Sequence, residues 1–279
     1  MADNQQSPAD GAWQRLQNLE GMARQRLSKD ISSFESAFQD AYEAGVIAPT
    51  LRTKAQTTFD VRCAVLHFKR VLNDLRAVWL LLESGYTSQA AAVTASLYEN
   101  ALATVCLTIS KKNIQEYLAK EDGELPWKPM AMAKMVVSHE GKAKHSTGYE
   151  NGWRSLYAHY VWLCQTKHPT IESVIHDASA SRIDTRYVVM ALPNVHSEDL
   201  PFKANVAIIA LSRTFEAIEA LLTAFGFKAP WPNDHDFAKR LESAKAASWN
   251  AYEPFLEARN PISIAKSWFP QSYPFIKDP

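Results

Sequence analysis

The chain has 279 residues, of which 47% are hydrophobic and 22% charged, and its 30 basic side chains balance 30 acidic ones. This length is enough for one large domain or two small ones with a substantial core. The zero net charge is not typical of a dedicated nucleic-acid binder, because phosphate neutralisation supplies much of the affinity of such proteins. The sequence also lacks the GxGxxG and P-loop cradles and the GxSxG nucleophile elbow, which argues against several common classes of enzyme.

Residues 10–44 are predicted to form one long amphipathic helix, because apolar side chains recur there at helical spacing with charges between them. Gly45 and Pro49 are expected to end this helix. An N-terminal helix of this length would allow self-association into a homodimer.

Two further helices, at about 53–83 and 87–110, are predicted to form an antiparallel hairpin at the centre of the fold. Gly85 stands between them, where a helix C-terminal glycine is expected. The second helix is nearly uncharged on every face, which indicates burial by neighbours on all sides. Glu99 lies in its middle, and a membrane span would avoid that carboxylate.

The rest of the chain is also read as mainly helical. Short helices are expected at 113–121 and 130–140, and longer ones at 152–167, 201–227 and 234–258. Residues 170–200 carry no clear pattern, and residues 260–279 hold aromatic side chains between prolines that rule out a regular helix. We therefore expect an all-α, single-domain bundle of about seven helices over residues 1–279, with a helical core at 53–258 and an extended tail at 260–279.

Glu99 is the first candidate for chemistry, since it is the only charge between Glu83 and Lys111 and a buried carboxylate must be paired or protonated. One interpretation is a buried Glu–Arg pair that fixes the packing of the hairpin, with Arg70 or Arg76 as partner. The other is a catalytic acid or a carboxylate that grips a ligand.

His168 is the second candidate, because Pro169 places it at the C-terminal end of the 152–167 helix. There it is either a capping histidine or a proton carrier in a cleft. If Glu99 and His168 face each other, Arg70 or Arg76 could complete a polar pocket around them.

A third candidate is the pair Arg154 and His159, spaced as in the helical ribonucleases of the HEPN superfamily. Those enzymes use an Arg and a His at this spacing for phosphate stabilisation and proton transfer without metal. The pattern is short enough to arise by chance, so a metal-independent ribonuclease is the alternative hypothesis and RNA is a partner only under it.

We expect no metal and no cofactor. The two His-Asp dipeptides do not stand in the surroundings typical of helical phosphohydrolases, and no HExxH is present. The three cysteines are widely spaced without a CxxC pair, and the polar N-terminus lacks a secretory signal. These features predict a cytoplasmic protein with no membrane association.

Four separated elements carry a resemblance to known proteins: Leu72-Asn-Asp-Leu-Arg76, Gly85-Tyr86-x-x-Gln89-Ala90, Ser96-Leu-Tyr-Glu-Asn100 and Leu163-Cys164-x-x-Lys167-His168-Pro169. Together, over residues 60–175, they resemble a group of uncharacterised bacterial helical proteins classed as domains of unknown function. The resemblance implies a helical bundle, a bacterial source and no assigned activity. Some such families lie near HEPN-like proteins. On this basis we expect a binding or regulatory module for an unknown small molecule or protein.

Overall fold

The computed structural model describes residues 11–51, 58–120, 124–139, 141, 144–168, 193–195, 199–228 and 236–256. Over these residues the protein is all-α, with nine α-helices and no strand. The predicted fold class is confirmed, although the helices number nine in the described ranges rather than about seven. The predicted aromatic tail, residues 260–279, lies outside the described residues.

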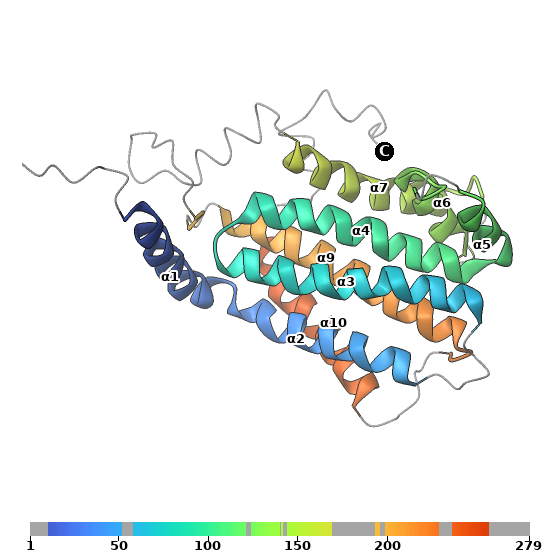
Figure 1. The fold of residues 1–279 in the computed structure, drawn as a ribbon, viewed down its shortest axis with the longest axis horizontal. Coiled ribbons are helices and arrows are strands. Elements are labelled where there is room, and N and C mark those ends of the chain that lie inside the picture. The colour runs from blue at the N-terminus through green and yellow to red at the C-terminus, as the bar shows by residue number, and fades with distance from the viewer. Residues whose placement is uncertain are drawn as a thin grey trace, which may run out of the picture.

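The predicted central hairpin is confirmed and consists of α3 (Phe59–Glu83) and α4 (Thr87–Ile109) (Figure 1). Gly85 connects them with φ of 84°, a left-handed conformation that glycine adopts without steric cost. The amides of Gly85 and Tyr86 donate to the carbonyls of Leu82 and Leu81, the pattern of a Schellman cap. A Cβ atom at Gly85 would lie 2.7 Å from Cβ of Pro193. Glycine is therefore required both by conformation and by space.

Helix α4 is enclosed by its neighbours, which explains why its sequence is so poor in charge. It packs against α3, α6 (Pro129–His139), α7 (Thr147–Lys167) and α9 (Leu200–Ala224). Among the described residues it is the one helix long and apolar enough to cross a membrane, but most of its apolar window is buried inside the bundle. Its apolar composition is thus accounted for by core packing.

The predicted helix at 10–44 is wrong in one respect, because the chain breaks at Ile31 into α1 (Ala12–Asp30) and α2 (Ser32–Ile47). The break lets α2 pack in the bundle against α3, α9 and α10 (Phe237–Tyr252), while Ile31 itself is buried. Helix α1 extends away from one end of the bundle (Figure 1). Only Ala23 and Leu27 of α1 are buried.

Polar contacts attach α1 to the turn of the central hairpin. The hydroxyl of Tyr86 donates to Glu20 Oε1 at 2.5 Å, and Arg24 Nε donates to Ser84 Oγ at 3.0 Å. These partners are about sixty residues apart in sequence, so tertiary contacts hold α1 in its orientation beyond the break at Ile31. Helical periodicity continues through the break and gives no signal of it.

The remaining elements are short. Helix α5 (Lys111–Leu118) follows α4 directly, and its N-cap Ser110 accepts a hydrogen bond from the Asn113 amide. Two 3-10 turns, Ala48–Thr50 and Glu253–Phe255, follow α2 and α10. Helices α5, α6 and the start of α7 cover the end of the bundle opposite α1 (Figure 1).

A buried ion pair ties the start of α9 to the start of α4. Lys203 and Asp199 are almost fully buried and in contact. The hydroxyl of Thr87 donates to Asp199 Oδ2 at 2.6 Å, and Lys203 Nζ donates to the Asn194 carbonyl at 2.9 Å. Burial lowers the pKa of Lys203, and Asp199 opposes that shift. Such a pair holds its elements in one register, because separating either charge from its partner inside the core is costly.

Candidate functional site

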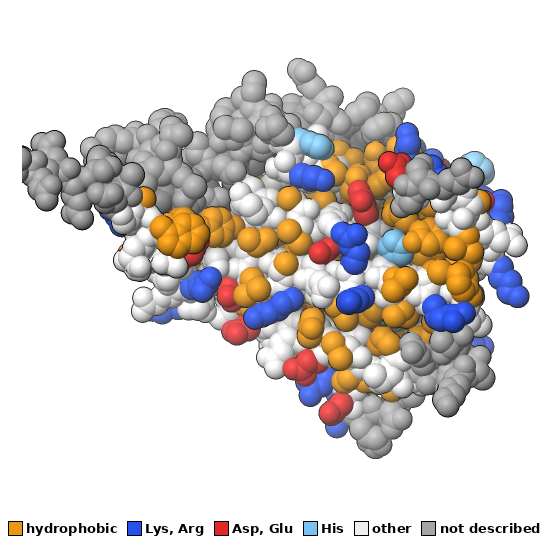
Figure 2. Space-filling view, in the orientation of Figure 1, with side chains coloured by type: hydrophobic (Ala, Val, Ile, Leu, Met, Phe, Trp, Pro, Cys, Tyr) orange, Lys and Arg blue, Asp and Glu red, His pale blue; other side chains and the backbone are white. Residues whose placement is uncertain are grey.

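Polar side chains gather along the surface where α3, α4 and α7 run side by side. Figure 2 shows basic, acidic and histidine side chains spread among hydrophobic and uncharged polar ones on the visible face. Helical spacing explains the alignment, since residues three, four and seven apart share one face. We call this set the polar strip, and its members are His67, Asp74, Ser96, Glu99, Asn100, Tyr160 and Cys164.

The centre of the polar strip is a hydrogen bond from the Tyr160 hydroxyl to Glu99 Oε1 at 2.5 Å. Both side chains are half-buried. Burial raises the pKa of Tyr160 far above its usual value, and the hydrogen bond to Glu99 raises it further. Burial likewise raises the pKa of the neighbouring Cys164 thiol. Tyrosine and cysteine are therefore both neutral near pH 7, and the tyrosine acts as a fixed donor to the carboxylate.

Glu99 keeps binding capacity after this contact. A carboxylate offers about four acceptor positions, and over the described residues its Oε2 atom has no hydrogen-bond partner in the protein. Lys167 lowers and Glu99 raises the pKa of Cys164, so both charges lie close to that thiol. A half-exposed carboxylate, a hydroxyl and an ammonium group thus converge around Cys164.

The second part of the polar strip centres on His67, which is held on both ring nitrogens. Nδ1 lies 2.9 Å from Asn100 Oδ1 and Nε2 lies 3.2 Å from the Tyr117 hydroxyl. The Asn100 amide nitrogen donates to the Ser96 carbonyl, so Asn100 Oδ1 is the acceptor and His67 carries its proton on Nδ1. Burial lowers the pKa of His67. His67 is a neutral, fully bonded ring that positions Asn100.

Asp74 completes this part of the strip, about two helical turns after His67 on the same face of α3. Ser96 Oγ donates to Asp74 Oδ2 at 2.9 Å, while burial raises the pKa of the Asp74 carboxyl. Arg70 is exposed, and its charge lowers the pKa of both His67 and Asp74. Arg70 therefore lies beside the polar strip, near His67 and Asp74.

The other predicted pocket residues are placed differently. Arg76 does not share the face of Asp74; it lines a separate groove between α2 and α3. The expected Glu–Arg pair at Glu99 is replaced by the Tyr160 hydrogen bond. His168 is exposed at the end of α7, and its backbone amide donates to the Cys164 carbonyl at 2.9 Å. Its backbone therefore lies one turn beyond Cys164, and a pocket shared by Glu99 and His168 stays a prediction.

Arg154 and His159 have separate environments. Arg154 is exposed, pairs with Glu150 at 3.0 Å and stacks over the Trp153 ring. Five residues on, His159 is rotated by about 140° around the helix, and its Nδ1 atom is buried with no hydrogen-bond partner among the described residues. Burial, aided by the charge of Arg213, lowers the pKa of His159 to about 3. At neutral pH this imidazole is uncharged, and its Nδ1 atom is buried although the residue as a whole is only half-buried.

Several residues of the polar strip were not singled out from the sequence. Tyr160 and Cys164 read as core positions of an amphipathic helix. His67 follows Arg62 at the same spacing as Arg154 and His159, a pattern short enough to arise by chance. The one usable signal was the common face of His67, Arg70 and Asp74 on α3. That signal becomes meaningful only when α4 is known to lie beside this face.

In the described part of the chain, no three His, Cys, Asp or Glu side chains are grouped so that they could hold a metal ion. His176, Asp177 and His235 fall outside the described residues.

Comparisons with family models, with curated proteins and with solved structures found no match to this chain. The polar strip and its surroundings are therefore interpreted from their own chemistry.

Proposed function

We propose that this protein is a binding or regulatory module of the bacterial cytoplasm that holds a small polar ligand at the polar strip. The observation that carries the proposal is the hydrogen bond from Tyr160 to Glu99, which fixes a half-exposed carboxylate and leaves its second oxygen unbonded within the described residues. Convergent polar groups with shifted pKa values are typical of functional sites.

The protonation states favour binding over catalysis. His67 and His159 are neutral because burial lowers their pKa values, and the Cys164 thiol is neutral because burial raises its pKa. A general acid or base works best when its pKa lies near the working pH. These groups are suited to orienting a ligand by hydrogen bonds.

The ligand chemistry follows from the polarity of the site. The Glu99 carboxylate can accept from a hydrogen-bond donor or pair with a cationic group of a ligand. Lys167 and Arg70, at the edges of the strip, can donate to an acceptor or an anionic group of the same ligand. Tyr157 stacks on Tyr160 with ring centroids 6.2 Å apart, which offers a flat apolar wall beside the carboxylate. A polar molecule with both donors and acceptors fits this combination.

The test is a titration of the full chain with four probes, glucose, adenosine, spermidine and citrulline, followed by the NMR signals of the backbone amides. We expect at least one probe to shift amides of α4 and α7, and Glu99→Gln to abolish that shift. Glu253→Gln, at an exposed position after α10, is the matched control and should leave it unchanged. Shifts that survive Glu99→Gln, or no shift with any probe, would contradict the proposal.

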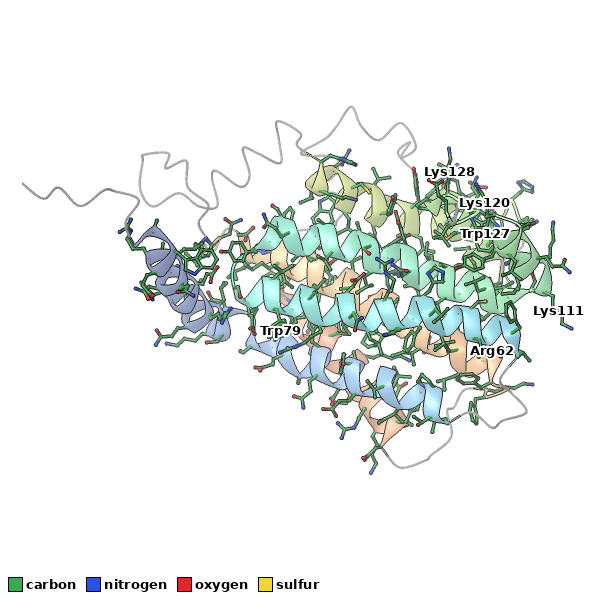
Figure 3. The ribbon with its side chains drawn as sticks, in the orientation of Figure 1. Arg62, Trp79, Lys111, Lys120, Trp127 and Lys128 are labelled. Atoms are coloured by element: carbon green, nitrogen blue, oxygen red, sulfur yellow. The ribbon has the colours of Figure 1, made fainter. Side chains whose placement is uncertain are left out.

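The alternative, a HEPN-like ribonuclease using Arg154 and His159, has one favourable observation. Lys134 Nζ and Arg154 both lie over the Trp153 ring, at 4.3 and 5.4 Å from its centroid. Figure 3 shows Lys111, Lys120 and Lys128 at the same end of the bundle. Basic side chains interleaved with aromatic rings suit RNA, whereas the buried, neutral His159 does not suit proton transfer.

An RNA cleavage assay separates the two functions. Under the binding proposal, the purified protein leaves single-stranded RNA intact. Cleavage that is lost in Arg154→Ala and in His159→Ala, with both variants still folded, would establish the alternative.

A further inference from the structure

A groove between α2 and α3 lies on a different face of α3 from the polar strip. It has a volume of about 330 Å³, within the range of small-molecule sites. Its floor is made by Phe38, Leu75 and Trp79, and its rim includes Glu35, Tyr42 and Arg76. The helical spacing of these residues explains the groove, since residues 35, 38 and 42 share one face of α2 and residues 75, 76 and 79 one face of α3.

The floor of the groove is aromatic. Phe38 and Trp79 are in ring contact, with centroids 5.1 Å apart, and both are buried apart from a narrow edge. Figure 3 shows Trp79 on α3 where that helix runs beside α2. Tyr42 is 39% exposed at the rim. A flat apolar group entering here would contact Trp79 below and Tyr42 at the side, a geometry that aromatic rings favour.

Two charges on the rim are left for a ligand. Glu43 also lines the groove, but it is engaged by Arg240 and by Gln39. Glu35 on α2 and Arg76 on α3 are exposed, and across the described ranges neither has a side-chain partner in the protein. A carboxylate on one wall and a guanidinium on the other complement an ammonium and a carboxylate on one small molecule.

We propose that this groove binds an aromatic zwitterion, a small molecule that carries a flat ring together with an ammonium and a carboxylate group, as a free aromatic amino acid does. The ring packs over Trp79 and against Tyr42. Arg76 pairs with the ligand carboxylate, and Glu35 pairs with its ammonium group. This groove shares no residue with the polar strip, so the test of this proposal is independent of the test of the proposed function.

The experiment follows the indole N–H signal of Trp79 in the full chain, identified by its loss in Trp79→Phe. Three probes are titrated: L-phenylalanine, phenethylamine without the carboxylate, and 3-phenylpropionate without the ammonium group. We expect all three to shift the Trp79 signal, with L-phenylalanine about tenfold tighter than either half-ligand, the ratio produced by one charged hydrogen bond of about 1.4 kcal/mol.

Two charge-removing variants then assign the contacts. Arg76→Gln should weaken L-phenylalanine and 3-phenylpropionate about tenfold and leave phenethylamine unchanged. Glu35→Gln should do the reverse, weakening the two probes that carry an ammonium group. Arg76 and Glu35 are both exposed, so the variants are expected to fold, and Glu253→Gln, at an exposed position outside both sites, serves as the control.

The proposal is overturned if L-phenylalanine leaves the Trp79 signal unmoved up to its solubility limit. It is equally overturned if the two half-ligands respond alike to Arg76→Gln and Glu35→Gln, since the charges on the walls would then play no part.

Discussion

The polar strip and the Asp199–Lys203 pair are both built from ionisable side chains packed on α4, yet they differ in their access to water. Asp199 and Lys203 are almost fully buried, and their contacts go to each other, to Thr87 and to a backbone carbonyl. Glu99 and Tyr160 are half-buried. Charges closed off from water hold the fold together, whereas charges that are oriented and still reachable can recognise a ligand.

The largest expected effect is at the buried pair. Lys203→Met leaves Asp199 buried without its partner, and we expect the free energy of unfolding to fall by about 3–5 kcal/mol. The double variant Asp199→Asn with Lys203→Met removes the stranded charge and should recover most of that loss. Urea unfolding measures both, and Lys228→Met at an exposed position is the control. A loss within error of the control would show that the pair contributes little.

The next effect concerns acid stability and depends on His159. Its pKa of about 3 in the folded protein lies below the ordinary value of 6.5. Between these two pH values, His159 binds a proton in the unfolded chain but not in the folded protein. Stability is therefore full above pH 6.5 and is lost as the pH falls toward 3. From pH 7 to pH 5 this histidine should cost about 2 kcal/mol.

The measurement is urea unfolding at pH 7 and pH 5 for the wild type and for His159→Gln. The variant should lose about 2 kcal/mol less than the wild type over this range, and His168→Gln, at an exposed position, should match the wild type. His67 contributes with the same sign, since burial also lowers its pKa. Equal pH dependence in the wild type and His159→Gln would mean that His159 is reached by solvent.

The smallest effect is at the polar strip. Tyr160→Phe removes one hydrogen bond to a half-exposed carboxylate, and we expect a loss of about 1 kcal/mol. Tyr42→Phe, at an exposed tyrosine on α2, should cost less than about 0.5 kcal/mol. If the strip is a ligand site, Tyr160→Phe should weaken probe binding by more than this small change in stability suggests. A loss above 3 kcal/mol would instead place Tyr160 among the residues that hold the core.

Much of the fold could be predicted because it depends on local sequence patterns, namely the spacing of apolar residues and the positions of turn residues. Apolar periodicity placed the helices of the central hairpin, and Gly85 marked the turn between them. Its φ of 84° confirms that it acts as the C-terminal glycine of α3. The break at Ile31 could not be predicted, because helical periodicity continues through it, and the contacts of α1 beyond it go to Ser84 and Tyr86 far along the chain.

The candidate site was predictable only in part. Glu99 stood out because a lone charge in an uncharged helix needs a partner, and Arg70 does lie near the same face. The partner itself, Tyr160, was missed because an aromatic residue on an amphipathic helix reads as core. Arg76 was grouped with Arg70, although six residues along a helix place it on another face, where α2 makes a groove with it.

By itself the sequence determined that the described chain is helical, that α3 and α4 form a hairpin and that Glu99 would need a polar partner. These features depend on residues within a few turns of one another, where helical geometry is the same in any protein. The tertiary structure alone decided which faces meet: it paired Glu99 with Tyr160, buried the Nδ1 atom of His159 near Arg213 and set Arg76 across a groove from Glu35. Such pairings depend on how helices distant in sequence are rotated and packed, and hydrophobic periodicity carries no record of which partner each polar side chain will find.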